Sequence, residues 1–529
     1  MAESFEFTVV GSGPAGGAVA AGLATSGKKP SVLLLKAGGS NDDHSLRVDG
    51  QRWQTLLRQG LNWGYKTVPQ EHCANREIDY SRGKGLGGSS AINFGVYTVG
   101  ARNDYERNGL GSQAMKLSDG TRPKRVSRHW KPLMAVSLLA SMPRYAAEWE
   151  HDLPPLLDTF ESVGFAINPD HNSGNPLGMS VLINTASKGV RSTSKDLLLP
   201  YPENLTVVTE SPVQRLVLEG SKAVGVESNG NKYYAPNEVV LSAGALDSPK
   251  IMMHSGLGAA NQLERFNIPV VRDIPLVGQG LRDHQFCPLV FTRAKGTTNR
   301  ASFYGDEKVM DEALEQWEKD GTGPWAKFAC ETGIGFFKLD AVTSSKEFQD
   351  LPKEEQAYLQ SETVPHMEVF THFPMHWFIP NFPKESLDYN CFLAFLYNSQ
   401  GRGEVTLQSS DPNVSLLFDP EFLAHAFDRR AAIESLRTVL KVVRSEEDLL
   451  KYWEQTISSS WHMTGTLKMG EKGDADAVMD PDFRVLGVQN LRVADMSAVP
   501  VLASARTQAV AYVTGIICAE KLIAEYGLA

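Results

Sequence analysis

The glycine-rich turn near the amino terminus constrains the fold of this chain more than any other stretch. The run Phe7–Val10 is apolar and rich in β-branched residues, as is typical of a buried parallel strand. The next segment, Gly11–Gly16, places its glycines in the spacing G-x-G-x-x-G. The small residues of Ala15–Leu23 predict a helix, and Ser31–Leu35 predicts a second buried strand. This order of elements predicts a βαβ unit that binds a nucleotide.

Each glycine of the turn has its own physical role in such a unit. Gly11 makes the tight turn, Gly13 lets a pyrophosphate approach the backbone, and Gly16 lets the helix lie close to the strand. The phosphates are expected at the positive end of the helix. The predicted nucleotide contacts of the turn are Gly11, Ser12, Gly13, Pro14, Ala15 and Gly16.

One residue of the unit departs from the usual pattern. The second strand is followed by Lys36, where Asp or Glu would normally accept hydrogen bonds from the adenosine ribose. Lysine has no acceptor, so Lys36 either pairs with a phosphate or points at solvent. We expect the ribose to be held less well than usual, or differently, near Lys36 and Ala37. On the sequence alone, Lys36→Glu is expected to tighten cofactor binding.

Composition narrows the class of protein. A chain of 529 residues predicts two domains or one large interleaved domain, and 42% apolar with 22% charged residues predicts a globular fold. The net charge of −10 argues against nucleic acid as the main partner. We find no apolar leader, membrane span or peroxisomal tripeptide, and so expect a cytoplasmic protein. Five scattered cysteines without CxxC predict a reducing compartment and no metal site.

A second glycine-rich stretch adds to the first. Gly83–Glu106 contains the run Gly-Leu-Gly-Gly-Ser-Ser, whose exposed N–H groups suit an anion, although a plain turn before a helix is the alternative. This stretch resembles the first signature of the glucose–methanol–choline (GMC) flavoprotein oxidoreductases, and Gly244–Gly258 resembles the second. Similar matches cover nearly the whole chain, at Val277–His284, Gly403–Pro412, Trp461–Gly470 and Asn490–Ile523.

The resemblance implies an α/β fold, α+β overall, that binds FAD rather than NAD. It implies a Rossmann-like FAD-binding domain built from the separate segments 1–150, 190–284 and 452–529, and an antiparallel-sheet substrate domain built from 151–189 and 285–451. Strands over Thr206–Val217 and Ala223–Glu227 would form a hairpin arm, and Ala91–Asn93 offers no histidine for a covalent flavin link. Further implied cofactor contacts are Leu86, Gly88, Ser89, Asn93, Phe94, Gly95, Val96, Val213, Ala494, Asp495, Thr507 and Gln508.

Two residues near the carboxyl terminus are the catalytic candidates. By resemblance, His462 faces the flavin N5 edge, where a neutral imidazole takes a proton as a hydride leaves carbon. Arg506 stands where the family has a second His or Asn. It stays protonated, so beside His462 it would disfavour the imidazolium. It could also hold a carboxylate or oxyanion, or pair with a buried acid and brace its loop. The His–Arg pair resembles that of the formate oxidase branch.

The middle of the chain is less informative. Met367–Phe373 alternates as a strand does; it could form the wall opposite the flavin or an ordinary core with surface histidines at His366, His372 and His376. Asp428–Ser445 has the apolar spacing of a packing helix. The segment 111–147 departs from the family pattern and is basic, and we assign it no function.

These observations predict an FAD-dependent oxidase or dehydrogenase that moves a hydride from an alcohol, aldehyde hydrate or small acid to flavin N5. A biosynthetic step is expected, with a small-molecule substrate, O2 or another electron acceptor, and neither a nucleic-acid nor a membrane partner. Lys36 and Arg506 keep a second interpretation open, a non-redox cyclase or lyase on the same fold that would resemble versicolorin B synthase. A formate oxidase-like enzyme is a further alternative for the substrate. The third interpretation is a catalytically silent flavin-binding relative.

Overall fold

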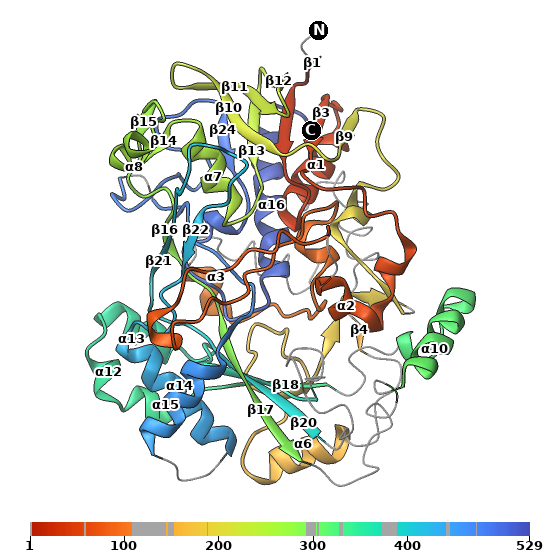
Figure 1. Cartoon of the computed structure of the whole chain (residues 1–529), viewed down its shortest axis with the longest axis vertical. Coiled ribbons are helices and arrows are strands. Elements are labelled where there is room, and N and C mark those ends of the chain that lie inside the picture. Colours follow the sequence, from red (N-terminus) through yellow and green to blue (C-terminus); the bar gives the residue numbers. More distant parts are fainter. Residues whose placement is uncertain are drawn as a thin grey trace.

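The structure is a computed structural model of the chain. It describes residues 3–57, 60–107, 144–145, 153–187, 189–292, 303, 306–326, 332–372, 389–440, 445–471 and 473–529. The atypical segment 111–147 lies outside these residues, apart from the short strand β4 (Arg144–Tyr145). Figure 1 shows two sheet-containing halves, one above the other, with the amino terminus at the top.

A five-stranded parallel sheet forms the centre of the upper half, in the order β24-β13-β2-β3-β9. All four neighbouring pairs run parallel. The predicted βαβ unit is present, since β2 and β3 flank the glycine turn and the helix α1 (Pro14–Ala24). The strands are β2 (Phe7–Val10), β3 (Val32–Leu35), β9 (Leu205–Val208), β13 (Glu238–Leu241) and β24 (Leu491–Val493).

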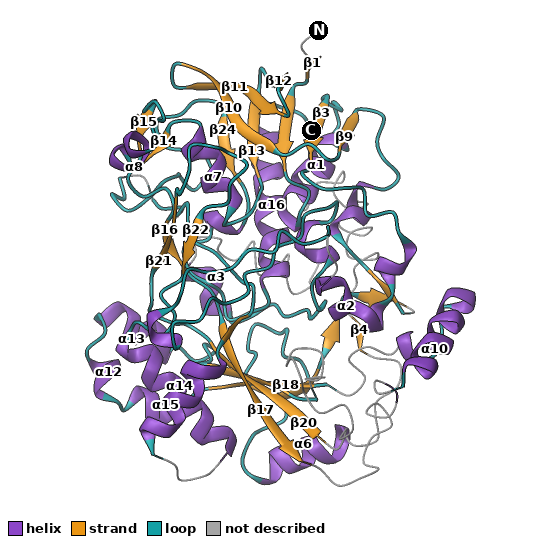
Figure 2. Cartoon of the chain, in the orientation of Figure 1, coloured by secondary structure: helices purple, strands orange, loops and turns teal. Residues whose placement is uncertain are grey.

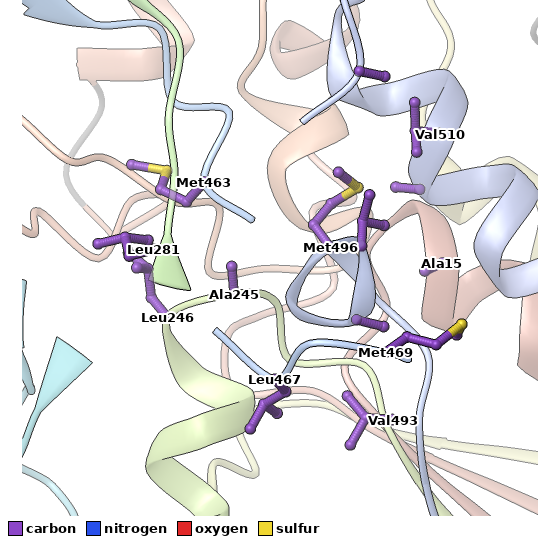
Figure 3. Packing of buried hydrophobic residues seen from close by; sticks show 14 of the residues in the cluster. Ala15, Ala245, Leu246, Leu281, Met463, Leu467, Met469, Val493, Met496 and Val510 are labelled. Atoms are coloured by element: carbon purple, nitrogen blue, oxygen red, sulfur yellow. The ribbon is translucent and has the colours of Figure 1, made fainter. Parts of the chain in front are cut away.

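Two helices with small residues at their contact cover this sheet. Helix α16 (Thr507–Glu525) lies against α1. The approach is close, because a side chain at Gly515 would overlap the backbone of Ala15. Figure 3 shows Ala15 and Val510, from these two helices, in the same apolar cluster as Ala245, Met463 and Met496. Segments far apart in sequence therefore share one core around the sheet.

A four-stranded sheet, in the order β1-β12-β11-β10, lies beside the parallel sheet. The hairpin arm is present, but its predicted boundary was wrong. Thr206–Val208 belongs to β9, whose apolar residues pair with β3, and the hairpin starts only at Val213, after a turn that contains Pro212. Its strands are β1 (Glu3–Ser4), β10 (Val213–Glu219), β11 (Lys222–Ser228) and β12 (Asn231–Tyr234).

The lower half contains a six-stranded antiparallel sheet, in the order β23-β17-β20-β19-β18-β5. Its strands are β5 (Gly178–Val181), β17 (Gln285–Thr292), β18 (Gly333–Phe337), β19 (Met367–Phe370), β20 (Tyr389–Leu396) and β23 (Ser458–Ser459).

Strand β19 is shorter than the sequence predicts. It ends at Phe370, and His372 has φ +56°, a left-handed conformation that does not continue a strand. All four residues of β19 are buried, so the strand has no solvent-facing polar side. His366 is buried as well, bonded to the backbone of Leu339 and Leu359, rather than a surface histidine. His376 and the aromatic residues from 373 to 378 lie outside the described part of the chain.

Helices α12 to α15 gather at one end of the antiparallel sheet (Figure 1). The predicted packing helix is α14 (Ala426–Leu440), which buries Ile433 and Leu436. The other helices are α2 (Arg52–Leu57), α3 (Arg102–Arg107), α6 (Leu153–Ser162), α7 (Asp247–His254), α8 (Ala260–Arg265), α10 (Glu307–Asp320), α11 (Asp340–Thr343), α12 (Lys346–Gln349), α13 (Lys353–Gln360) and α15 (Glu446–Thr456).

The remaining strands form small sheets of two or three strands. They are β6 (Ile183–Asn184), β7 (Ala186–Ser187), β8 (Val190–Arg191), β14 (Leu257–Gly258), β15 (Arg272–Asp273), β16 (Gln279–Leu281), β21 (Gly403–Thr406) and β22 (Leu417–Asp419). Among the described helices, none combines the length and apolar character that crossing a membrane requires.

Candidate active site

A cavity extends between the two sheets. It is lined at one end by Gly13 and Lys36, at the carboxyl edge of the parallel sheet, and at the other by Phe370 and Phe395 of the antiparallel sheet. His462, from the loop after β23, lies along the same cavity. Ligands of open α/β sheets bind at the carboxyl ends of the strands, so this is the position where a dinucleotide is expected.

The glycine turn has the geometry that a bound pyrophosphate requires. Gly11 has φ +100°, and a side chain there would overlap Ser242, while a side chain at Gly16 would overlap the backbone of Gly11. In contrast, a side chain at Gly13 would meet no protein atom within 4 Å and would enter the cavity. The first and third glycines are therefore needed for packing, and the second leaves room for a ligand.

The second glycine-rich loop packs against the first. Gly87 and Gly88 have φ +90° and +54°, and a side chain at Gly88 would lie 2.7 Å from the Cα of Gly13. The 3-10 turn Gly88–Ala91 follows. Farther along the loop, Asn93 donates from Nδ2 to Oε1 of Gln508 at 2.7 Å. This bond ties the loop to the first turn of α16, next to the cavity.

Asp495 is a buried carboxylate that ties its own loop to the segment that leads from β13 into α7. Its Oδ2 accepts hydrogen bonds from the backbone of Gly244 at 2.8 Å and from Ser248 Oγ at 2.5 Å. Its Oδ1 accepts from the backbone and hydroxyl of Ser497. Burial raises the pKa of Asp495, and these hydrogen bonds act in the opposite direction. Asp495 lines the cavity, but both oxygens already brace protein loops.

Lys36 does not point at solvent, so that reading of the sequence was wrong. Its side chain is buried and lines the cavity beside Gly13. Burial lowers the pKa of Lys36 to about 8, with Asp247 raising it and Arg82 lowering it. Asp247, in the first turn of α7, lines the same cavity. The lysine therefore faces an acid that the sequence pattern did not single out.

His462 is held by its ring nitrogen Nδ1. This atom lies 2.9 Å from Nδ1 of His284 and 3.3 Å from Oγ of Ser460. The hydroxyl of Ser460 donates to the carbonyl oxygen of His284 at 2.9 Å, so towards His462 it can only accept. With Ser460 as the acceptor, the proton of His462 is assigned to Nδ1 and the lone pair to Nε2.

His284 takes the complementary tautomer. Since its Nδ1 accepts from His462, its proton is on Nε2, which is buried and has no hydrogen-bond partner among the described residues. The ring of Tyr397 lies against His284 edge to face, with ring centroids 4.2 Å apart. His284 is the residue of this pair that sequence reasoning missed, although it ends the family-like segment Val277–His284.

The surroundings keep His462 neutral. Its pKa is well below the ordinary value, because of burial first and then of His284, Arg506 and Arg82. Its backbone N–H donates to Asp283 Oδ1 at 2.7 Å. A neutral imidazole with a free Nε2 is chemically able to accept a proton at neutral pH.

Arg506 is paired with an acid that comes from the antiparallel sheet. Its Nη2 donates to Oε1 of Glu368 in β19, and the hydroxyl of Tyr397 donates to Oε2 of the same carboxylate. The guanidinium also lies over the ring of Phe395, 4.2 Å from its centroid. Burial raises the pKa of Glu368, while Arg506 and Tyr397 lower it. The bracing role considered for Arg506 thus has a definite partner.

The structure brings most of the predicted site residues together. Those that line the cavity are Gly13, Pro14, Ala15, Lys36, Gly88, Ser89, Asn93, Phe94, Gly95, Val96, His462, Asp495, Arg506, Thr507 and Gln508. Those that do not are Gly11, Ser12, Gly16, Ala37, Leu86, Val213 and Ala494. Residues of the cavity and its surroundings that sequence reasoning did not single out include Trp63, Arg82, Asp247, His284 and Glu368.

The residues present fit FAD. Gly13 leaves space where a diphosphate approaches a backbone, and α1 begins directly behind it. The glycine turn, the loop 88–96 and the start of α16 would hold the cofactor, which supplies a hydride acceptor when bound. Within the described ranges, no group of three or more His, Cys, Asp or Glu side chains is arranged to hold a metal ion.

Comparison with known proteins agrees with this geometry. Two family models match, each described as GMC oxidoreductase, over residues 12–286 and 399–515. An oxygen-dependent choline dehydrogenase of Sinorhizobium medicae is 28% identical over 564 residues, covering 99% of this chain and 96% of that protein. The glucose methanol choline oxidoreductase atC of Aspergillus terreus is 28% identical over 588 residues, covering 99% of this chain and 93% of that protein.

Solved structures show the same fold. A crystal structure of formate oxidase superposes with a TM-score of 0.86 at 25% identity, covering 100% of both chains. With two matching family models that together span most of its length, this chain belongs to the GMC oxidoreductase family and is an FAD-dependent oxidoreductase acting on CH–OH groups.

Proposed function

We propose that the protein oxidises a small uncharged alcohol or aldehyde hydrate, with Nε2 of His462 as the base that takes the hydroxyl proton. The observation that carries the proposal is the pair of polar contacts at Nδ1 of His462, because a proton placed on Nδ1 by these contacts leaves Nε2 unprotonated on a ring that lines the cavity. Bound FAD supplies the hydride acceptor. The imidazole stays neutral because burial and neighbouring cations disfavour a second proton.

The preference for an uncharged substrate comes from Arg506 and Glu368. The buried carboxylate offsets the charge of the guanidinium, so an anionic substrate would have to compete with it. The cavity near His462 is otherwise lined by Phe286, Leu393 and Trp461, which suit an apolar group next to the reacting carbon.

A small carboxylic acid is the second candidate substrate. Nε of Arg506 is buried and has no hydrogen-bond partner among the described residues. A guanidinium with an unused donor can hold a carboxylate, and formate oxidase is a structural neighbour of this chain. This candidate requires Glu368 to yield part of its contact with Arg506.

Three finer parts of the proposal come from the sequence and the relatives. O2 is proposed as the electron acceptor, in line with the oxygen-dependent choline dehydrogenases among the relatives. A biosynthetic role and a cytoplasmic location are retained as proposals from the sequence. Identification of the substrate and imaging of the tagged protein in its own cells test them.

Anaerobic mixing with a panel of small alcohols, aldehydes and formate tests the proposed reaction. The absorbance of the oxidised flavin should bleach with an uncharged member of the panel. Turnover of a compound without bleaching would support the non-redox cyclase or lyase instead. A flavin that responds to no member, even at high concentration, would favour the catalytically silent reading.

A further inference from the structure

The buried Lys36 leaves one part of the cofactor without its usual partner. In dinucleotide-binding units, a carboxylate after the second strand accepts hydrogen bonds from the ribose hydroxyls. Here that position is occupied by a lysine whose side chain lines the cavity. A lysine only donates, so the ribose needs an acceptor from another element.

Asp247 is a carboxylate at this end of the cavity. It begins helix α7, and its Oδ1 accepts a hydrogen bond from the hydroxyl of Tyr65 at 2.9 Å. No hydrogen bond to its Oδ2 is seen among the described residues. Tyr65 itself stacks on Trp63, which also lines the cavity. One carboxylate oxygen is thus fixed by the protein, and the other remains for a ligand.

The topology places Lys36 and Asp247 on opposite sides of the glycine turn. Strands β3 and β13 flank β2, so their carboxyl ends are two strand spacings apart, about 10 Å. Lys36 directly follows β3, and Asp247 follows the loop after β13. The four-carbon stem of a lysine extends into this crevice, where Asp247 raises the pKa of Lys36 and Lys36 lowers the pKa of Asp247.

We propose that Asp247 accepts the hydrogen bonds of the adenosine ribose of FAD, and that the positive charge of Lys36 favours the ionised carboxylate for this contact. In this proposal the acid that contacts the ribose lies at the start of α7 instead of after β3, and Lys36 occupies the position after β3. The proposal concerns the cofactor, so it is independent of which substrate is oxidised.

The rival explanation is that Lys36 binds a phosphate of the cofactor directly. The glycine turn and the start of α1 already offer backbone N–H groups at that position. Arg82, a second cation, also lines the cavity, so a phosphate there would not depend on Lys36 alone. The two explanations differ in one respect: only the first makes the effect of Lys36 depend on Asp247.

Flavin binding to apoprotein, followed by fluorescence quenching, separates the explanations. FAD and FMN are compared, because FMN carries the isoalloxazine and one phosphate but no adenosine. Asp247→Asn should weaken FAD binding about 10- to 100-fold, as expected for a lost hydrogen bond to a charged group, and leave FMN binding unchanged. Lys232→Met, which removes the charge of an exposed lysine outside the cavity lining, is the matched control and should bind FAD normally.

A double-mutant cycle then tests the role of Lys36. Lys36→Met alone should weaken FAD binding, and its effect should disappear in the Asp247→Asn background. If a variant yields no stable apoprotein, the rate of FAD release from diluted holoenzyme replaces the titration. Normal FAD affinity in Asp247→Asn, equal losses for FAD and FMN, or a full Lys36→Met effect without Asp247 would each overturn the proposal. All three results would leave the FAD-dependent reaction itself standing.

Discussion

The proton on Nδ1 of His462 is located by two neighbours, Ser460 and His284. His462→Ala removes the proposed base while leaving the glycine turn intact. We expect FAD to stay bound and flavin reduction by substrate to slow about 10²–10⁴-fold, the usual contribution of a positioned base. Stopped-flow absorbance measures the rate. An unchanged rate with full flavin content would remove His462 as the base and favour the non-redox reading.

His284 acts on the reaction through His462, so it is a positioning residue. His284→Leu removes the acceptor for Nδ1 and should slow flavin reduction by about 5- to 30-fold, equivalent to about 1–2 kcal/mol. His284→Asn keeps an acceptor at this position and should recover most of the rate. Equal losses in both variants, with normal flavin content, would show that His284 only fills space.

The pH dependence of reduction follows from the lowered pKa of His462. A base works in its neutral form, and an imidazole with the ordinary pKa of about 6.5 loses that form below neutrality. Because burial holds the pKa of His462 well below this value, the reduction rate should stay constant from pH 8 down to about pH 6. A rate that halves near pH 6.5 would mean that His462 has an ordinary pKa or that another group is the base.

Lys36 shows how the structure changes an expectation drawn from the sequence. From the sequence alone, Lys36→Glu is expected to tighten FAD binding. In the structure, that substitution would bring a second carboxylate to the cavity beside Asp247, and like charges at one site repel. We now expect weaker FAD binding in Lys36→Glu, measured by the same fluorescence titration. Tighter binding would indicate that the residue after β3 contacts the ribose, as in the usual pattern.

At the scale of secondary-structure elements, the glycine turn offers a matched pair of substitutions. In Gly13→Val the new side chain meets no protein atom and enters the cavity, so the apoprotein should fold normally but bind no FAD. In Gly16→Val the side chain overlaps the backbone of Gly11, which should destabilise the apoprotein by about 1–3 kcal/mol. Flavin absorbance and thermal unfolding of both apoproteins measure the difference. Full flavin occupancy in Gly13→Val would contradict the proposed pyrophosphate site.

The link between α16 and β19 is the buried pair of Arg506 and Glu368. Removing one partner of a buried ion pair typically costs about 3–5 kcal/mol, so Arg506→Ala should lower both thermal stability and flavin content. Arg506→Met combined with Glu368→Gln should be less destabilised than Arg506→Ala, since no charge is left unpaired. Normal stability in Arg506→Ala, with a large loss in kcat/KM, would instead indicate direct binding of a substrate carboxylate or oxyanion.

Local patterns predicted the local elements. Strand β2 matches its predicted range, and α1 and β3 match to within a residue or so, because periodicity and glycine spacing are set by neighbouring residues. Strand β19 was predicted too long, since the left-handed conformation of His372 is not visible in composition. The ion pair between Arg506 and Glu368 joins residues 138 positions apart. No spacing rule reports such a contact, and none places Lys36 and Asp247 along the same cavity.

At the scale of the whole molecule, the parallel sheet supports the proposed division of the chain. Its five strands all fall within the segments 1–150, 190–284 and 452–529, proposed as the FAD-binding domain. Five of the six strands of the antiparallel sheet fall within 151–189 and 285–451, proposed as the substrate domain, and β23 is the exception. The cavity lies where the two sets of segments meet.

This interleaving predicts that the first segment cannot fold alone. A fragment of residues 1–150 contains β2 and β3 but lacks the other three strands of the parallel sheet and helix α16. We expect it to be unfolded, with no cooperative thermal transition by circular dichroism and no affinity for FAD. A cooperative transition in the fragment would show that the βαβ unit is stable without its neighbours.

The sequence order of the elements also sets the order of events during synthesis. The glycine turn leaves the ribosome long before β24 and α16, the strand and helix that complete its surroundings. At about 5–20 residues per second, the turn waits roughly 25–100 s for them. Flavin can therefore be captured only after α16 has been synthesised, and a nascent chain that stops short of α16 carries an exposed apolar βαβ unit that chaperones must shield.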